Sequence, residues 1–171
     1  KINFIGPSAD SMNLCGDKMR CKAAMLKAEV PTVPGSPGLV KDADDAEKIA
    51  NEIGYPVMLK SVYGGGGRGI RIVTNDKELR EGFESVTGES IAAVGKSAIL
   101  VEKFLEKTRH IEYQFARDTH GNAVHIFERE CSIQRRHQKI IEESPSPALE
   151  NDLRLEMCKV AVQITEGIQY E

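Results

Sequence analysis

The chain has 171 residues, of which 40% are hydrophobic, and its formal net charge at pH 7 is -3. This length and composition suffice for one ordinary domain or two small ones with a buried core. The slight acidic excess argues against a general nucleic-acid binder, which needs a basic excess to neutralise phosphates, so a bound anion must be held by a local site.

The four cysteines, Cys15, Cys21, Cys131 and Cys158, form no CxxC pair and have no histidines at zinc spacing. This favours free, reduced thiols in a cytosolic setting over a disulfide framework or a zinc site. We expect neither export nor membrane anchoring, because no apolar run reaches spanning length and the first residues lack the features of a signal peptide. Strand-like residues at the start and a helical pattern at the end lead us to expect a segment of a longer polypeptide.

The first predicted element is a helix over residues 17–29, where apolar residues recur at helical spacing. Asp10 or Ser11 is a candidate cap for an earlier turn. The pattern breaks at VPTVPGSPG, residues 30–38, whose prolines and glycines indicate a linker or domain boundary near Thr32.

A compact α/β unit is predicted from this boundary to Phe104. Its expected elements are a helix over 42–53, a strand over 56–62, a glycine-rich loop, a strand over 70–73, a helix over 76–86 opened by Asn75, a soft Gly/Ser/Ala stretch and a strand over 98–104.

The remaining residues predict a hairpin and a helix. Residues 110–118 and 123–131 alternate in polarity about the turn THGN, and His110 shares one face with Glu112 and Gln114. The polar run IQRRHQK follows. A closing helix is expected over 149–168, with these residues facing inward: Leu153, Met157, Val160, Ala161 and Ile164.

The stretch KSVYGGGGRGIRIV, residues 60–73, places glycines between two strands. It satisfies G-x-G-x-x-G, but that dinucleotide fingerprint requires a helix after the loop, and no Walker A sequence follows. A glycine hairpin can cover nucleotide phosphates with its backbone N–H groups, because no Cβ blocks the approach. A floppy surface hairpin is the alternative, and Lys60 favours the phosphate lid because it lies among apolar residues where a solvated lysine is out of place.

Residues 128–145 contain the densest cluster of charge. Taken as one extended segment, they project Arg135, His137 and Lys139 to one side, and crowded cations predict a compensating anion such as phosphate or bicarbonate. The alternative is a solvated basic strand balanced by nearby glutamates. Residues 98–105 also have two interpretations: an ordinary strand end, or a link between two domains whose backbone donors and acceptors meet an adenine edge.

Taken in order, six motifs resemble those of the biotin carboxylases over essentially the whole chain: FIGPS, GDK, VPTVPG, IGYPVMLKSVYGGGGRGIRIV, VEKFLEKTRHIE and ERECSIQRRHQKIIEESPSP. The biotin carboxylases are the ATP-grasp subunits or domains of acetyl-CoA, propionyl-CoA and pyruvate carboxylases. The ECSIQRRHQK string discriminates, since other ATP-grasp ligases share the glycine hairpin but not this string. The resemblance implies an incomplete α+β ATP-grasp fold, in which residues 1–31 connect to an absent N-terminal domain, 32–104 form a mobile α/β lid domain, and 105–171 begin the central antiparallel-sheet domain.

The resemblance also implies a set of site residues. Lys18, Lys60, Gly66 and Gly67 would contact the ATP phosphates, and His110 and His137 would reach the nucleotide. A hinge would hold adenine, and it comprises Glu102, Lys103, Phe104 and Leu105. The other implied nucleotide-binding positions are Gly64, Gly65, Ile70 and Gln134. Lys139 matches the position associated with bicarbonate or carboxyphosphate, so Lys60, His137 and Lys139 are the implied catalytic residues.

The family reaction transfers the γ-phosphoryl group of ATP to bicarbonate, and carbon dioxide from the resulting carboxyphosphate carboxylates biotin on a carrier protein. The resemblance thus implies ATP, Mg²⁺ and biotin as cofactors, a biotin carboxyl carrier protein and a carboxyltransferase as partners, a homo-oligomer, and a cytoplasmic or mitochondrial-matrix setting. The family's metal-binding glutamates belong to strands beyond Glu171, so we expect no metal site here and no activity from this chain alone. The alternatives are another ATP-grasp carboxylate-amine or carbamoyl-phosphate-type ligase, or a non-catalytic nucleotide-binding module.

Overall fold

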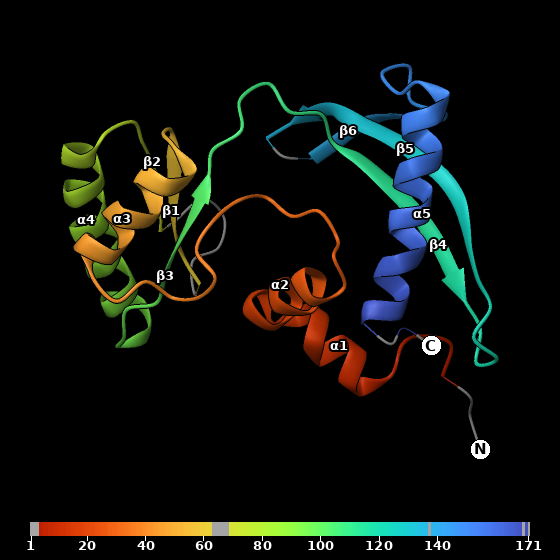
Figure 1. Cartoon of the computed structure of the whole chain (residues 1–171), viewed down its shortest axis with the longest axis horizontal. Coiled ribbons are helices and arrows are strands. Elements are labelled where there is room, and N and C mark those ends of the chain that lie inside the picture. The colour runs from red at the N-terminus through yellow and green to blue at the C-terminus, as the bar shows by residue number, and fades with distance from the viewer. Residues whose placement is uncertain (1–3, 63–68, 137, 169, 171) are drawn as a thin grey trace. The chain divides into compact units, whose positions relative to one another are not determined.

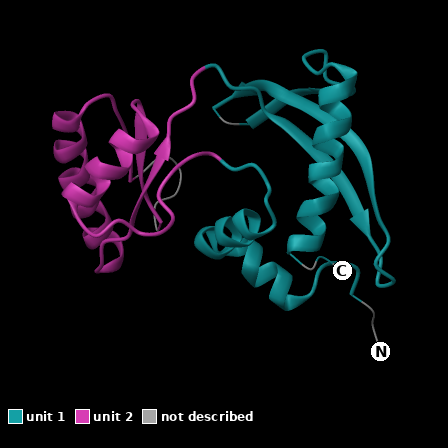
Figure 2. Ribbon diagram, in the orientation of Figure 1, with its two compact units in different colours: residues 1–32, 107–171 teal, residues 33–106 magenta. Residues whose placement is uncertain are grey.

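The computed structural model describes residues 4–62, 69–136, 138–168 and 170. The chain divides into two compact units (Figure 2). Unit 1 comprises residues 1–32 and 107–171, and unit 2 comprises residues 33–106. Within the described ranges, no helix is long and apolar enough to cross a membrane.

Unit 2 is a three-stranded antiparallel sheet with two helices packed on one face (Figure 1). Its elements are α3 (Ala43–Ile53), β1 (Val57–Ser61), β2 (Ile70–Val73), α4 (Asp76–Val94) and β3 (Ile99–Lys103), with β1 central in the sheet. Val57 and Leu59 of β1 are fully buried against the helices. Because side chains alternate along a strand, Met58 and Lys60 lie on the opposite face.

Local signals set the ends of these helices. Asp42 and Asn75 accept hydrogen bonds from the first-turn amides, and for Asn75 this confirms the predicted helix start. The helices α3 and α4 end before Gly54 and Gly95, whose φ values are 77° and 75°. The prediction that the second helix stops near Val86 is wrong, because α4 continues to Val94. The polar TGES sequence resembles a loop, but the packing of buried side chains holds it in the helix.

Unit 1 contains a second antiparallel sheet, in the order β4 (Ile111–Arg117), β5 (Ala123–Arg135) and β6 (Gln138–Glu143). The helix α5 (Asn151–Gly167) packs against β4 and β5, and its C-terminal end meets α2 (Lys18–Lys27), which follows α1 (Ala9–Gly16) (Figure 1). Ser8, rather than the predicted Asp10 or Ser11, caps α1. The predicted hairpin between β4 and β5 is confirmed. The predicted inward residues of α5, Leu153 included, line one cavity together with β4 residues, although Leu153 is 48% exposed.

The run at residues 133–139 turns back on itself instead of continuing as one extended strand. β5 ends at Arg135, Arg136 has a φ of 50°, and β6 pairs antiparallel with β5 so that Gln134 lies opposite Lys139. The prediction that Arg135 and Lys139 project from one extended segment is therefore wrong. The turn escaped sequence reasoning because it contains no glycine, asparagine or aspartate in the positions that usually mark a tight hairpin.

Candidate functional site

Lys60 is part of a half-buried ion pair in unit 2. Its Nζ donates to Glu102 Oε2 at 2.5 Å, and the two side chains are 38% and 22% exposed. β1 and β3 bring the pair together, with Lys60 opposite Leu100 and Glu102 opposite Met58. The lysine that the sequence places among apolar residues is therefore compensated by a carboxylate of its own unit.

Ile70, the first residue of β2, lies directly opposite Lys60 in the sheet. Two of the predicted nucleotide-binding residues are thus adjacent on neighbouring strands. The other residues predicted around this loop, Gly64, Gly65, Gly66 and Gly67, lie outside the described residues, and so does Tyr63.

In the hinge, residues 102–105, the side chain of Lys103 is bonded within unit 2. Lys103 Nζ donates to the carbonyl oxygens of Gly54 and Tyr55, each at 2.8 Å, which ties it to the end of α3. The amides of Lys103 and Phe104 donate to two proline carbonyls. Leu105 is 48% exposed, and its amide donates no hydrogen bond to any described residue.

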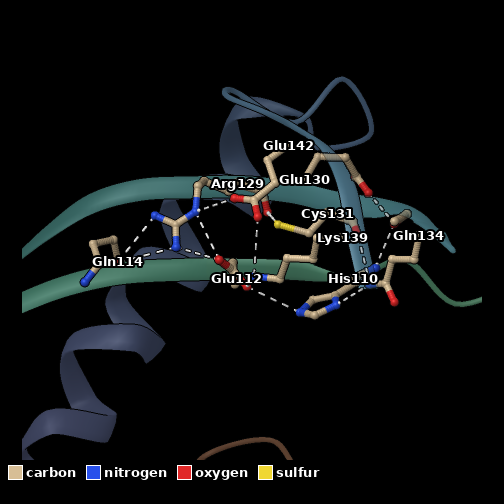
Figure 3. A network of polar contacts seen from close by, with 10 residues as sticks. His110, Glu112, Gln114, Arg129, Glu130, Cys131, Gln134, Lys139 and Glu142 are labelled. Carbon is tan, nitrogen blue, oxygen red and sulfur yellow. Dashed lines mark hydrogen bonds and ion pairs between the residues drawn. The ribbon is translucent and has the colours of Figure 1, made fainter. Parts of the chain in front are cut away.

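A second cluster lies on the face of the unit 1 sheet that α5 leaves uncovered. Glu112 of β4 is its centre (Figure 3). Its Oε1 accepts from Arg129 Nη2 at 2.5 Å and Nε at 3.0 Å, and its Oε2 accepts from Lys139 Nζ and lies 3.4 Å from His110 Nε2. One carboxylate thus joins Arg129 of β5, Lys139 of β6 and His110, the residue just before β4.

Two further residues complete this cluster. Gln134 Nε2 lies 2.8 Å from His110 Nδ1 and donates to the carbonyl of Cys131 at 2.8 Å. Glu142 of β6 lies 3.4 Å from Arg129 Nε and 3.8 Å from Lys139 Nζ. The structure therefore brings three of the predicted residues together on one face: His110, Gln134 and Lys139.

The electrostatics of this cluster revise the expected role of its cations. The hydrogen bonds from Lys139 and Arg129 lower the pKa of Glu112 from 4.5 to about 2, and the hydrogen bond to Glu112 raises the pKa of Lys139. At neutral pH both partners are charged. The anions that compensate Lys139 and Arg129 are the carboxylates of Glu112 and Glu142, so crowded cations alone do not call for an external anion.

Sequence reasoning missed Arg129 and gave Glu112 no role. The available signal was the polarity alternation of the two strands, which puts Arg129 opposite Glu112 once the hairpin register is known. The predicted His137 lies outside the described residues. Lys18 begins α2 after its cap Asp17 and is exposed, and its assignment as a nucleotide ligand stays a prediction.

The residues around Glu112 do not fit a magnesium ion. Glu112, Cys131 and Glu142 place ligand atoms within 4.8 Å of one another. Mg²⁺ prefers oxygen ligands in octahedral geometry. Here both carboxylates are engaged by Lys139 and Arg129, and burial raises the pKa of the Cys131 thiol. We therefore derive no step through a metal at this place.

Comparisons with known proteins cover nearly all of the chain. Residues 17–171 match the family model of the carbamoyl-phosphate synthase L chain, ATP binding domain. A biotin carboxylase of Nostoc sp. is 50% identical over 169 residues, which are 99% of this chain and 38% of that protein. The chain therefore spans well under half of this relative's length.

Two solved structures agree with these sequence relationships. The first is a biotin carboxylase-beta-gamma-ATP complex from Campylobacter jejuni, with a TM-score of 0.86, 46% identity, and coverage of 99% of this chain and 38% of that one. The second is the biotin carboxylase domain dimer of Hydrogenobacter thermophilus 2-oxoglutarate carboxylase with MgADP, ADP and bicarbonate, with a TM-score of 0.84, 47% identity, and coverage of 99% and 37%.

Proposed function

The chain belongs to the family of the carbamoyl-phosphate synthase L chain ATP-binding domain and has the ATP-grasp fold of the biotin carboxylases it matches, and from this premise we propose that it is the ATP-binding core of a biotin carboxylase. The observation that carries the proposal is the meeting of Lys139, His110 and Gln134 on one sheet face. We assign residues 32–104 to a lid domain, 105–171 to the start of the central domain, and 1–31 to a connector.

In this proposal the two ends of the nucleotide are held by different groups. Lys18, Lys60 and the glycines of the loop bind phosphates, since an ammonium and backbone N–H groups are suitable phosphate donors. The hinge binds adenine through its backbone, because the Lys103 side chain is already bonded to the end of α3. Ile70 packs beside Lys60, while His110, Gln134 and His137 face the remainder of the nucleotide.

Lys139 is assigned to bicarbonate. An ammonium has three N–H donors, so Lys139 can donate to Glu112 and to a bicarbonate oxygen at the same time. Glu112 then keeps Lys139 protonated and fixes its direction. Because bicarbonate is a weak nucleophile that must meet another anion, the residues contribute orientation, charge neutralisation and exclusion of water.

The chemical step is a phosphoryl transfer. A bicarbonate oxygen attacks the γ-phosphorus, the bond to the bridging oxygen breaks, and ADP leaves with that oxygen, which produces carboxyphosphate. Carboxyphosphate then breaks down into carbon dioxide and inorganic phosphate. The ureido nitrogen of biotin forms the new C–N bond with carbon dioxide and gives its proton to that phosphate. We propose that the Mg²⁺ ligands lie beyond Glu171 in a protein as long as the relatives. The proposed partners are a biotin carboxyl carrier protein, a carboxyltransferase and a second copy of the protein.

The test is ATP hydrolysis by the full-length protein, measured with and without bicarbonate and free biotin. We expect hydrolysis to require bicarbonate and to be stimulated by biotin. Lys139→Ala should retain nucleotide binding and lose biotin-dependent turnover, whereas Lys60→Ala should weaken nucleotide binding itself. Lys77→Ala, an exposed change on α4, is the matched control. An equal loss of nucleotide affinity in the Lys139 and Lys60 variants would contradict these roles.

Two other functions give different results in the same assay. A carbamoyl-phosphate or carboxylate-amine ligase, which the description of the matched family makes the main rival, would hydrolyse ATP in response to ammonia or an amino acid and ignore biotin. A non-catalytic module would bind nucleotide without turnover under every condition. Either result would overturn the biotin carboxylase proposal.

A further inference from the structure

The part of α4 that the sequence pattern did not predict carries Glu89, whose carboxylate bridges two groups at the start of β2. Its Oε2 accepts a hydrogen bond from the backbone amide of Gly69 at 3.0 Å, and its Oε1 pairs with Arg71 Nη2. Arg71 also donates to Ser85 Oγ of the same helix at 3.3 Å and to the carbonyl of Ile70 at 2.8 Å. A single helix residue therefore holds two residues, Gly69 and Arg71, on either side of Ile70 at the start of β2.

Gly69 is fixed from two sides. It is buried and has a φ of 71°, a conformation that residues with a side chain rarely adopt. Its carbonyl accepts from the amide of Ser61 at 2.8 Å, while its own amide is bonded to Glu89. A hydrogen bond to an ionised acceptor is roughly twice as strong as one between neutral groups. The position of Gly69 relative to both β1 and α4 is therefore well determined.

This fixation has a consequence for the residues assigned to the nucleotide. Ile70 follows Gly69 directly and lies opposite Lys60. Because a strand that slips by one residue moves every side chain to the other face, the point at which β2 begins decides whether Ile70 and Lys60 are adjacent. The contacts of Glu89 act at that point.

We infer that Glu89 is a positioning residue for nucleotide binding: it holds Gly69 and Arg71 so that Ile70 stays in register with Lys60. The inference rests on the proposed function. Glu89 does not touch the nucleotide in this arrangement and acts only through the start of β2. Its loss should therefore weaken nucleotide binding and leave bicarbonate recognition unchanged.

The experiment compares four variants of the full-length protein by ADP and ATP titration and by steady-state kinetics. Glu89→Ala should weaken nucleotide binding about tenfold, equivalent to the net value of one charge-assisted hydrogen bond. Glu89→Gln keeps an acceptor for the Gly69 amide and should weaken nucleotide binding about threefold. Arg71→Met leaves the hydrogen bond from the Gly69 amide to Glu89 in place and should weaken nucleotide binding less than Glu89→Ala does. Glu84→Gln, which removes a charge from the exposed face of α4, should match the wild type.

The readouts separate positioning from general damage. The KM for bicarbonate at saturating ATP should not change in any of these variants, whereas a general structural defect would move both KM values. Unchanged nucleotide affinity in Glu89→Ala, or a larger loss in Arg71→Met, would overturn the inference while the proposed function stands. If Glu89→Ala does not fold, Glu89→Gln against Glu84→Gln gives the same comparison. A wild-type protein that binds no nucleotide would overturn both the proposed function and this inference.

Discussion

Replacing Glu112 by glutamine removes the charge that Lys139, Arg129 and His110 share, while leaving the shape of the side chain. The pKa of Glu112 is lowered from 4.5 to about 2, mainly by the hydrogen bonds from Lys139 and Arg129. Without solvent screening, a pKa shift of this size corresponds to ~3 kcal/mol of unfolding free energy. Its side chain is 23% exposed and its partners are more so. Solvent screening therefore reduces the expected loss of unfolding free energy to about 1 kcal/mol at neutral pH.

The pH dependence of this loss distinguishes charge from shape. A carboxyl whose pKa is lowered by folding contributes stability above its unfolded pKa and loses that contribution as the pH falls towards its folded pKa. The difference between wild type and Glu112→Gln should therefore be constant from pH 7 to about 5 and shrink between pH 4.5 and pH 2. Urea unfolding at pH 7, 5 and 3.5 measures it, and a carbon-13 NMR titration of the Glu112 carboxyl checks the pKa.

Glu142→Gln is the control for this prediction. The Glu142 carboxylate is 41% exposed and lies no closer than 3.4 Å to Arg129 or Lys139. Glu142→Gln should therefore lower the unfolding free energy less than Glu112→Gln does. A Glu112→Gln difference that is as large at pH 3.5 as at pH 7 would show that packing, not charge, is lost. A Glu112 titration midpoint near 4.5 would refute the network as described.

Two other substitutions test the packing that supports the site. Arg154→Met should lower the unfolding free energy by about 3 kcal/mol in thermal or urea unfolding. The reason is that the fully buried carboxylate of Glu128 loses the guanidinium that donates to it at 2.6 Å. A variant as stable as the wild type would contradict this pairing. Gly35→Ala should lower the melting temperature and weaken nucleotide binding, because a Cβ at this position would lie 2.5 Å from the Val101 carbonyl oxygen, beside Glu102. Gly16→Ala is the control and should change neither quantity, because its Cβ would meet no atom within 4 Å.

The sequence predicted unit 2 well where local chemistry alone sets the structure. Asp42, Asn75 and Gly54 mark helix ends through their own side chains or lack of one, and these signals do not depend on the rest of the fold. The strand at residues 70–73 was likewise predicted correctly, because a short β-branched run between a glycine loop and a capping residue has few other structures open to it.

The missed features depend on contacts between distant residues. The polar sequence around Glu89 is typical of a loop, but buried Val86 and Ser90 keep it helical through packing and through a hydrogen bond from Ser61 Oγ to Ser90 Oγ at 3.2 Å. The turn after Arg135 is set by the pairing of β5 with β6, since arginine has no intrinsic preference for the positive φ found at Arg136. Both features bear on the site, so the site was harder to predict than the core.

Lys139 can contribute in two ways, through its positive charge and through the direction of its N–H donors. Lys139 and Arg129 are matched by Glu112 and Glu142, so these four groups supply no net positive charge at neutral pH. What they supply is direction, because the ammonium of Lys139 is held on one side by Glu112 and keeps other N–H donors free. Removing the donor and removing its holder are therefore different perturbations. In the proposed reaction, loss of Lys139 should appear in kcat, and loss of Glu112 should appear first in the KM for bicarbonate, because an unheld ammonium must be oriented again at each binding event.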